Sequence, residues 1–202
     1  MKLATAFFLA LAACASTAGS AQAQALFAAD DTRVANEGTI GDKWALADGA
    51  TLATPAYPPA MAARGDDVCL ALGYLINPDG STSDFAVLRQ WNSGTGDQEP
   101  QDGYWGAFAQ SGADALSQWR FKPRPDAGAV RPTYTVATLA FTGANGKGGD
   151  IRGHCRIDDL AATVQERKSD AYMRLSRERG DLDRANNASR ALRAMNEAPG
   201  RR

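Results

Sequence analysis

The clearest feature of the hydrophobic pattern is an unbroken apolar run, VCLALGYLI, at residues 68–76. A run of this length between polar segments predicts a strand. Residues 77–80, NPDG, then predict a turn, because proline presets one residue and glycine tolerates a positive φ. Residues 81–91, STSDFAVLRQW, return as a second strand. We therefore predict a β-hairpin over residues 67–91.

A helical spacing of apolar residues follows the glycine-rich loop at residues 92–103. The residues on this stripe are Trp105, Phe108, Gly112, Ala115, Leu116 and Trp119. Their intervals place them on one face of a helix of about four turns. Pro123 ends it, because the residue before a proline is pushed out of the helical region. Residues 133–141, TYTVATLAF, are rich in β-branched and aromatic side chains and predict a third strand.

The order of elements indicates the fold class. Upstream of the hairpin, PAMAARG at residues 59–65 predicts a short helix that Gly65 ends. The order is then helix, strand, strand, helix, strand. This predicts an α+β domain with one small three-stranded antiparallel sheet and two helices on one face. The segments are a signal peptide at 1–25, an extended lead-in at 26–54, the domain at 55–142, a glycine-rich loop at 143–154 and a charged helical tail at 155–202.

The first residues have the layout of an export signal. A lysine at position 2 precedes an apolar stretch from Leu3 to about Ala15, and Ala-Gln-Ala repeats follow. The stretch is shorter than the roughly 20 residues that a membrane-spanning helix needs. Cleavage after Ala23 or Ala25 would release an exported mature chain. The alternative is a lipobox ending at Cys14, which would make the chain a membrane-anchored envelope lipoprotein or structural protein.

The mature N-terminus distinguishes these two forms. We expect intact-mass spectrometry of the exported protein to find a free Gln24 or Leu26. A diacylglyceryl group on Cys14 would contradict this expectation and would support the anchored form.

The cysteine count bears on stability. If Cys14 leaves with the signal, Cys69 and Cys155 remain, and an even count in an oxidising compartment favours a disulfide between them. The alternative is a buried Cys69 and a free, exposed Cys155.

Charge and composition argue against several classes of function. The chain has 22 basic and 23 acidic residues, and this balance gives no reason to expect a nucleic-acid partner. Its single histidine, His154, and the absence of a Cys-x-x-Cys pair argue against a catalytic triad and a metal site. We therefore expect no enzyme activity, no catalytic residues, no metal and no cofactor.

Residues 55–142 as a whole resemble the C-terminal domain of TonB and of TonB-like energy transducers. The matching features, in the family's order, are Tyr57-Pro58, Gly65, the turn Pro78-Asp79-Gly80, and the run Trp119-Arg120-Phe121-Lys122-Pro123. The resemblance implies a periplasmic module that binds other proteins of the Gram-negative envelope without catalysis and is linked to TonB-type transport. Because a spanning N-terminal helix and a long proline-rich spacer are missing, we expect no energy coupling by this chain itself.

The resemblance also implies how binding occurs. In TonB, this domain holds a short peptide of outer-membrane receptors by adding it as a strand beside its last strand. Here the corresponding edge is the strand at 133–141, with Thr133, Thr135, Ala137, Leu139 and Phe141 as the predicted binding residues. Receptor peptides and other envelope proteins are thus the expected partners, and a second copy of the chain is also a candidate. Membrane contact is expected only if Cys14 is lipidated.

One departure from the family concerns the outer face of the sheet. The hairpin register places Cys69, Ala71, Gly73 and Leu75 on the face that family members commonly leave polar. A cover is therefore predicted, namely the tail segment that begins at Cys155 and carries the stripe Ile157, Leu160 and Val164. A Cys69–Cys155 bond would hold this segment in place.

Overall fold

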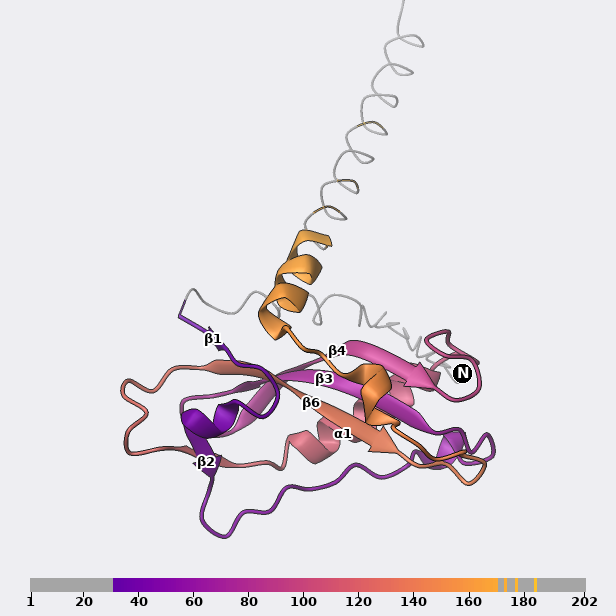
Figure 1. Cartoon of the computed structure of the whole chain (residues 1–202), viewed down its shortest axis with the longest axis horizontal. Helices are drawn as coiled ribbons and strands as arrows, with labels where there is room; N and C mark the ends of the chain where they lie inside the picture. The colour runs from indigo at the N-terminus through magenta and orange to yellow at the C-terminus, as the bar shows by residue number, and fades with distance from the viewer. Residues whose placement is uncertain (1–30, 171–172, 174–176, 178–183, 185–202) are drawn as a thin grey trace, which may run out of the picture.

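A four-stranded sheet forms the centre of the molecule (Figure 1). The computed structural model describes residues 31–170 together with residues 173, 177 and 184, so the signal segment, Cys14 and most of the tail beyond residue 170 lie outside the described residues. The sheet has the order β1-β6-β3-β4, and a second, two-stranded sheet pairs β2 with β5. The strands are β1 (Arg33–Val34), β2 (Trp44–Leu46), β3 (Val68–Ile76), β4 (Thr82–Asn92), β5 (Phe121–Pro123) and β6 (Thr133–Phe141).

The predicted α+β class and hairpin are confirmed, but the sheet is larger than predicted. β3 is paired antiparallel with both β4 and β6, as expected. The lead-in adds a fourth strand, since β1 runs parallel to β6 at its outer edge. It also supplies β2, which pairs antiparallel with β5.

The helices also differ from the prediction. The expected helix at 59–65 is only a 3-10 turn, η3 (Pro59–Met61), which follows an extended Pro58 and precedes Gly65 at φ +61°. The second helix, α1 (Tyr104–Leu116), is present but ends before Trp119. The remaining elements are two further 3-10 turns, η2 (Ile40–Asp42) and η4 (Arg152–Cys155), and a helix at residues 160–170. The sheet therefore has α1 on one face and the tail helix on the other, instead of two helices on one face.

The main core lies between the sheet and α1. Phe108 of α1 is fully buried and meets Phe141 of β6 edge to face, with ring centroids 4.9 Å apart. Gly112 lets the helix approach the sheet closely, because a Cβ there would lie 2.8 Å from Leu139 Cδ1. Trp119 still reaches this core from beyond the helix and donates a hydrogen bond from Nε1 to the Ala53 carbonyl at 2.8 Å.

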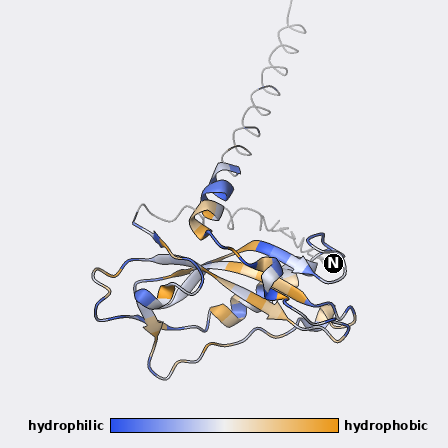
Figure 2. Cartoon of the chain, viewed as in Figure 1, coloured by the Kyte–Doolittle hydropathy of each residue, from blue (hydrophilic) through white to orange (hydrophobic). Residues whose placement is uncertain are grey.

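The opposite face of the sheet is covered by the tail, as predicted. Its buried residues form a second core: Cys69, Ala71, Leu75, Leu88, Tyr134 and Val136 from the sheet, and Cys155, Ile157, Leu160 and Val164 from the tail. Figure 2 shows apolar residues at the base of the tail helix and hydrophilic residues farther from the sheet. Burial of this apolar surface holds the first turns of the helix on the domain.

A disulfide between Cys69 and Cys155 joins the tail to β3, which confirms the predicted pairing. The two Cα atoms are 5.9 Å apart, within the usual range for a bridge, and both residues are fully buried. Next to the bond, His154 stacks on Trp91 with ring centroids 3.7 Å apart. The tail is thus attached covalently as well as by packing.

Tyr134 allows a test of the second core. Its hydroxyl is buried without a hydrogen-bond partner and lies over Gly73, where a Cβ would be 2.2 Å from it. Because an unpaired buried hydroxyl is unfavourable, we expect Tyr134→Phe to leave the free energy of unfolding unchanged or to raise it by up to about 1 kcal/mol in urea titrations. A loss of more than about 1 kcal/mol would show that the hydroxyl has a partner.

We also expect Tyr134→Phe to change how the free energy of unfolding depends on pH in alkaline solution. Burial raises the pKa of Tyr134 from 10.0 to about 12. A raised folded-state pKa contributes stability that is complete below pH 10 and is lost as the pH rises through 12. Tyr134→Phe should therefore lose less stability than the wild type between pH 10 and pH 12.

Candidate peptide-binding edge

The sheet has two edges, and the β4 edge is poorly suited to accept another strand. The pairing of β4 with β3 shifts register twice, and Asp84, at φ 54°, lies at the second of these shifts. The Arg167 guanidinium of the tail helix also donates a hydrogen bond to the Leu88 carbonyl. Irregular pairing of this kind is a common way of protecting an edge strand.

The start of the β6 edge is occupied by the lead-in. β1 pairs with Thr133 and Tyr134, and the Ala35 amide donates to the Tyr134 carbonyl at 2.9 Å. The pairing with β1 does not extend beyond Tyr134. The remaining part of β6 is therefore the part of this edge at which another strand could be added.

The backbone groups that face outward on β6 belong to alternate residues. Tyr134 bonds outward to β1, so by alternation the outward groups beyond it are those of Val136, Thr138 and Ala140. The predicted binding residues lie between them, and by the same alternation their backbone groups face β3: Thr133, Thr135, Ala137, Leu139 and Phe141. Their side chains are all buried. Peptide binding at this strand stays a prediction, and the groups offered to a partner are those of the alternate residues, which we call the open edge (Val136, Thr138 and Ala140).

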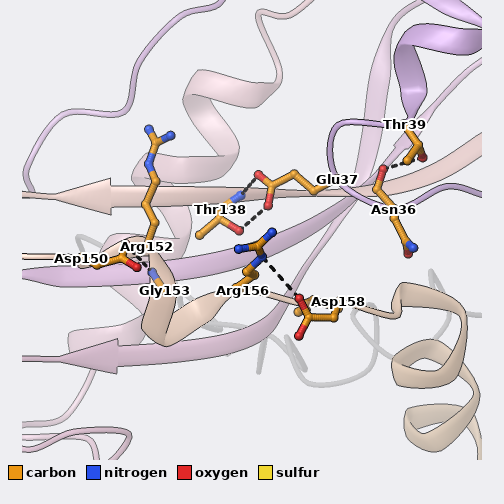
Figure 3. Close-up of a pocket in the computed structure, with 10 residues that line it drawn as sticks. Asn36, Glu37, Thr39, Thr138, Asp150, Arg152, Gly153, Arg156 and Asp158 are labelled. Atoms are coloured by element: carbon orange, nitrogen blue, oxygen red, sulfur yellow. Dashed lines mark hydrogen bonds and ion pairs between the residues drawn. The ribbon is translucent and has the colours of Figure 1, made fainter.

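Thr138 is the residue of the open edge that already has an outward partner. Its N–H donates to Glu37 Oε1 and its hydroxyl to Glu37 Oε2, each at 2.6 Å (Figure 3). Thr138 is 7% exposed, whereas Glu37 lies on the surface. Glu37 was not predicted, because it lies 101 residues from Thr138 in the sequence and no local pattern marks the contact.

A hollow of about 460 Å³ opens beside Thr138. It lies between the lead-in, β6 and the segment that carries η4, and Arg152, Arg156, Asp150 and Asp158 line it (Figure 3). Arg156 pairs with Asp158 at 3.3 Å, and Asp150 accepts the Gly153 N–H at 3.0 Å. Within the described part of the chain, Arg152 makes no ion pair.

Next to this hollow, the lead-in is hydrogen-bonded to the start of the tail helix. Asn36 Oδ1 accepts the Leu160 N–H at 2.9 Å, and Asp159 Oδ1 accepts the Ala162 N–H at 2.9 Å. These bonds satisfy backbone donors in the first turn of the tail helix. Glu37 therefore directly follows a residue, Asn36, that is hydrogen-bonded to the tail helix.

The described residues show no site for a metal and no helix suited to a bilayer. No group of three or more His, Cys, Asp or Glu side chains that could hold a metal ion is present among them. None of their helices combines the length and apolar character needed to cross a membrane.

The comparisons with known proteins include a partial similarity in fold to a solved structure. No family model matches the chain, and no curated protein matches it. Among solved structures, it is similar to the solution NMR structure of the Pseudomonas aeruginosa TonB CTD, at 21% identity and a TM-score of 0.37. The match covers 54% of this chain and 92% of that one. A similarity of this extent concerns the outline of the fold and says nothing of what the present chain binds.

Proposed function

We propose that the mature chain is an exported, periplasmic protein-binding module that accepts an extended segment of another envelope protein as an added strand at the open edge. The observation that carries this proposal is the state of Thr138. Its outward N–H is bonded to a surface side chain instead of a neighbouring strand. An edge of this kind provides main-chain bonds for affinity, and the adjacent hollow provides side-chain contacts for selectivity.

Two features support export. The sequence begins with the three-part pattern of a signal peptide, and the Cys69–Cys155 bond suits an oxidising compartment. The link to TonB-type transport and to receptor peptides rests on the sequence resemblance alone. The proposal includes no energy coupling and no catalysis.

The proposal is tested by NMR on the isotope-labelled mature protein with a library of short extended peptides. A peptide that adds as a strand should slow amide hydrogen exchange at Thr138 and Ala140, the outward residues of the open edge that lie farthest from β1. The amides of Ala137 and Leu139, which already pair with β3, should change little. Strand addition would be contradicted if a bound peptide protected the outward and the inward amides equally. It would also be contradicted if no peptide bound.

Proline variants provide a matched control. Ala140→Pro removes an outward N–H from the open edge, and Gln90→Pro makes the same change on β4, the opposite edge strand. Edge strands tolerate proline at outward positions. We expect Ala140→Pro to abolish peptide binding and Gln90→Pro to leave it intact. Equal losses in the two variants would point to a general effect on the fold.

A further inference from the structure

Thr138 has the donor arrangement of a carboxylate-binding site. Its N–H and hydroxyl point to the same side and bind the two oxygens of one carboxylate, each at 2.6 Å. An ionised carboxylate is an acceptor at both oxygens, and bonds to it are stronger than neutral ones. Because Thr138 is more than nine-tenths buried, its two donors are fixed before any ligand arrives.

Glu37, the group that fills this site, is not part of the sheet. It lies on the surface of the lead-in, and its side-chain hydrogen bonds within the described chain are those to Thr138. Its removal would leave the hydrogen bonds between β6 and β3 unchanged, because by alternation these come from the neighbouring residues, such as Ala137 and Leu139. The side chain can therefore be exchanged for another carboxylate.

The charges of the hollow favour such an exchange. Glu37, Asp150 and Asp158 are its acidic residues, and Arg152 and Arg156 its basic ones. Once Glu37 has left, two basic and two acidic side chains remain, so an incoming carboxylate meets no net negative charge. Arg152 is also available to it, since Arg156 already pairs with Asp158.

We propose that Thr138 and the adjacent hollow form a carboxylate-binding site, that Glu37 occupies it in the free protein, and that a partner strand binds by placing its own carboxylate there. This inference rests on the proposed function and names the partner's chemistry. β1 blocks the edge at Thr133 and Tyr134. A strand that runs antiparallel to β6 must therefore end near Thr138, where its terminal carboxylate would take the place of a main-chain carbonyl. A side-chain carboxylate is the second source.

The site itself is tested with acetate as the probe. In the mature Glu37→Ala protein, sodium acetate should shift the Thr138 amide resonance in a saturable way, and sodium chloride at the same ionic strength should not. Asp158→Ala is the matched control, because it removes one negative charge from the same hollow and leaves Glu37 in place. An equal response of the two variants, or no response in Glu37→Ala, would overturn the inference.

Peptides that bind the open edge test the exchange. Loss of the internal competitor should tighten their binding to Glu37→Ala by about tenfold or more, the gain expected from a charge-assisted hydrogen bond. Asp158→Ala should change it by less than about threefold. Glu37→Gln, which keeps one acceptor without the charge, should fall between the wild type and Glu37→Ala.

The source of the carboxylate is found by comparing each peptide with its C-terminal amide and with versions in which Asp and Glu are replaced by Asn and Gln. A loss of affinity on amidation assigns the site to a C-terminus, and a loss on the side-chain change assigns it to an acidic residue. If peptides protect the open-edge amides from exchange but lose no affinity on amidation or on the side-chain change, the carboxylate inference is overturned and strand addition remains supported. If Glu37→Ala binds acetate in a saturable way but no peptide of the library adds as a strand, the carboxylate site is supported and the proposed function is contradicted.

Discussion

Replacing both Cys69 and Cys155 with alanine should lower the free energy of unfolding by about 4 kcal/mol. The bond joins residues 86 positions apart, and closing a loop of that length in the unfolded chain is expected to contribute roughly 4 to 5 kcal/mol at most. The measurement is a urea titration of the mature protein, oxidised and reduced. The reduced wild type should unfold close to the double alanine variant.

Comparing the oxidised wild type with the double alanine variant also separates the stabilisation by the disulfide from that by the packing around it. If the oxidised wild type and the double variant differed by less than about 1 kcal/mol, the second core would be holding the tail without help from the bond. If the variant failed to fold, the effect of the bond would exceed the entropic expectation. Reduction of the folded wild type then gives the same comparison from a protein that has already folded.

Replacing Leu160 with alanine should cost about 3 kcal/mol. Leu160 is fully buried at the first turn of the tail helix, and deletion of a buried leucine side chain removes transfer energy and leaves a cavity. Glu166→Ala, an exposed change on the same helix, should shift the free energy by no more than about 0.5 kcal/mol. Urea titration at pH 7 measures both. A cost below about 1 kcal/mol for Leu160→Ala would mean that the tail contributes little to the second core.

The two predictions are coupled. With the disulfide intact, the tail remains tethered to β3, and Leu160→Ala measures packing alone. In the double alanine background, part of the packing energy is already lost if the tail detaches, so Leu160→Ala should cost less there. A double-mutant cycle over Cys155 and Leu160 measures this difference.

The parts of the fold that sequence reasoning predicts are those with strong local signals. The apolar run of β3 and the turn ending at Gly80 specify the hairpin without reference to the rest of the chain. In the structure, Gly80 adopts φ +82° and donates its N–H to the Asn77 carbonyl. The disulfide was predictable because an export signal and the count of cysteines both bear on it.

The parts that sequence reasoning misses depend on tertiary contacts. β1, β2 and β5 have only two or three residues each, which is too few to show a period. Pro123, predicted only to end a helix, lies in β5 opposite Trp44. The stripe through Trp119 predicts a longer helix than the one that forms, since periodicity reports which side chains are buried and not where the backbone leaves the helix.

The candidate site shows the same limit. The pattern of residues 133–141 predicts a strand, but alternation of side chains does not say which backbone groups face outward. That depends on the register with β3, which leaves the groups of Thr138 outward and those of Ala137 and Leu139 inward. The contact with Glu37 forms only when the lead-in returns to the sheet.

The treatment of the two sheet edges has a consequence for stoichiometry. On β4, the shifted register and the Arg167 contact interrupt the row of backbone groups, and on β6 the lead-in pairs with Thr133 and Tyr134. In the described part of the four-stranded sheet, this leaves one short segment open on these two edges. If the proposed strand addition occurs, we expect one strand to bind per molecule, and titrations with a binding peptide should reach their end point at a ratio of one to one.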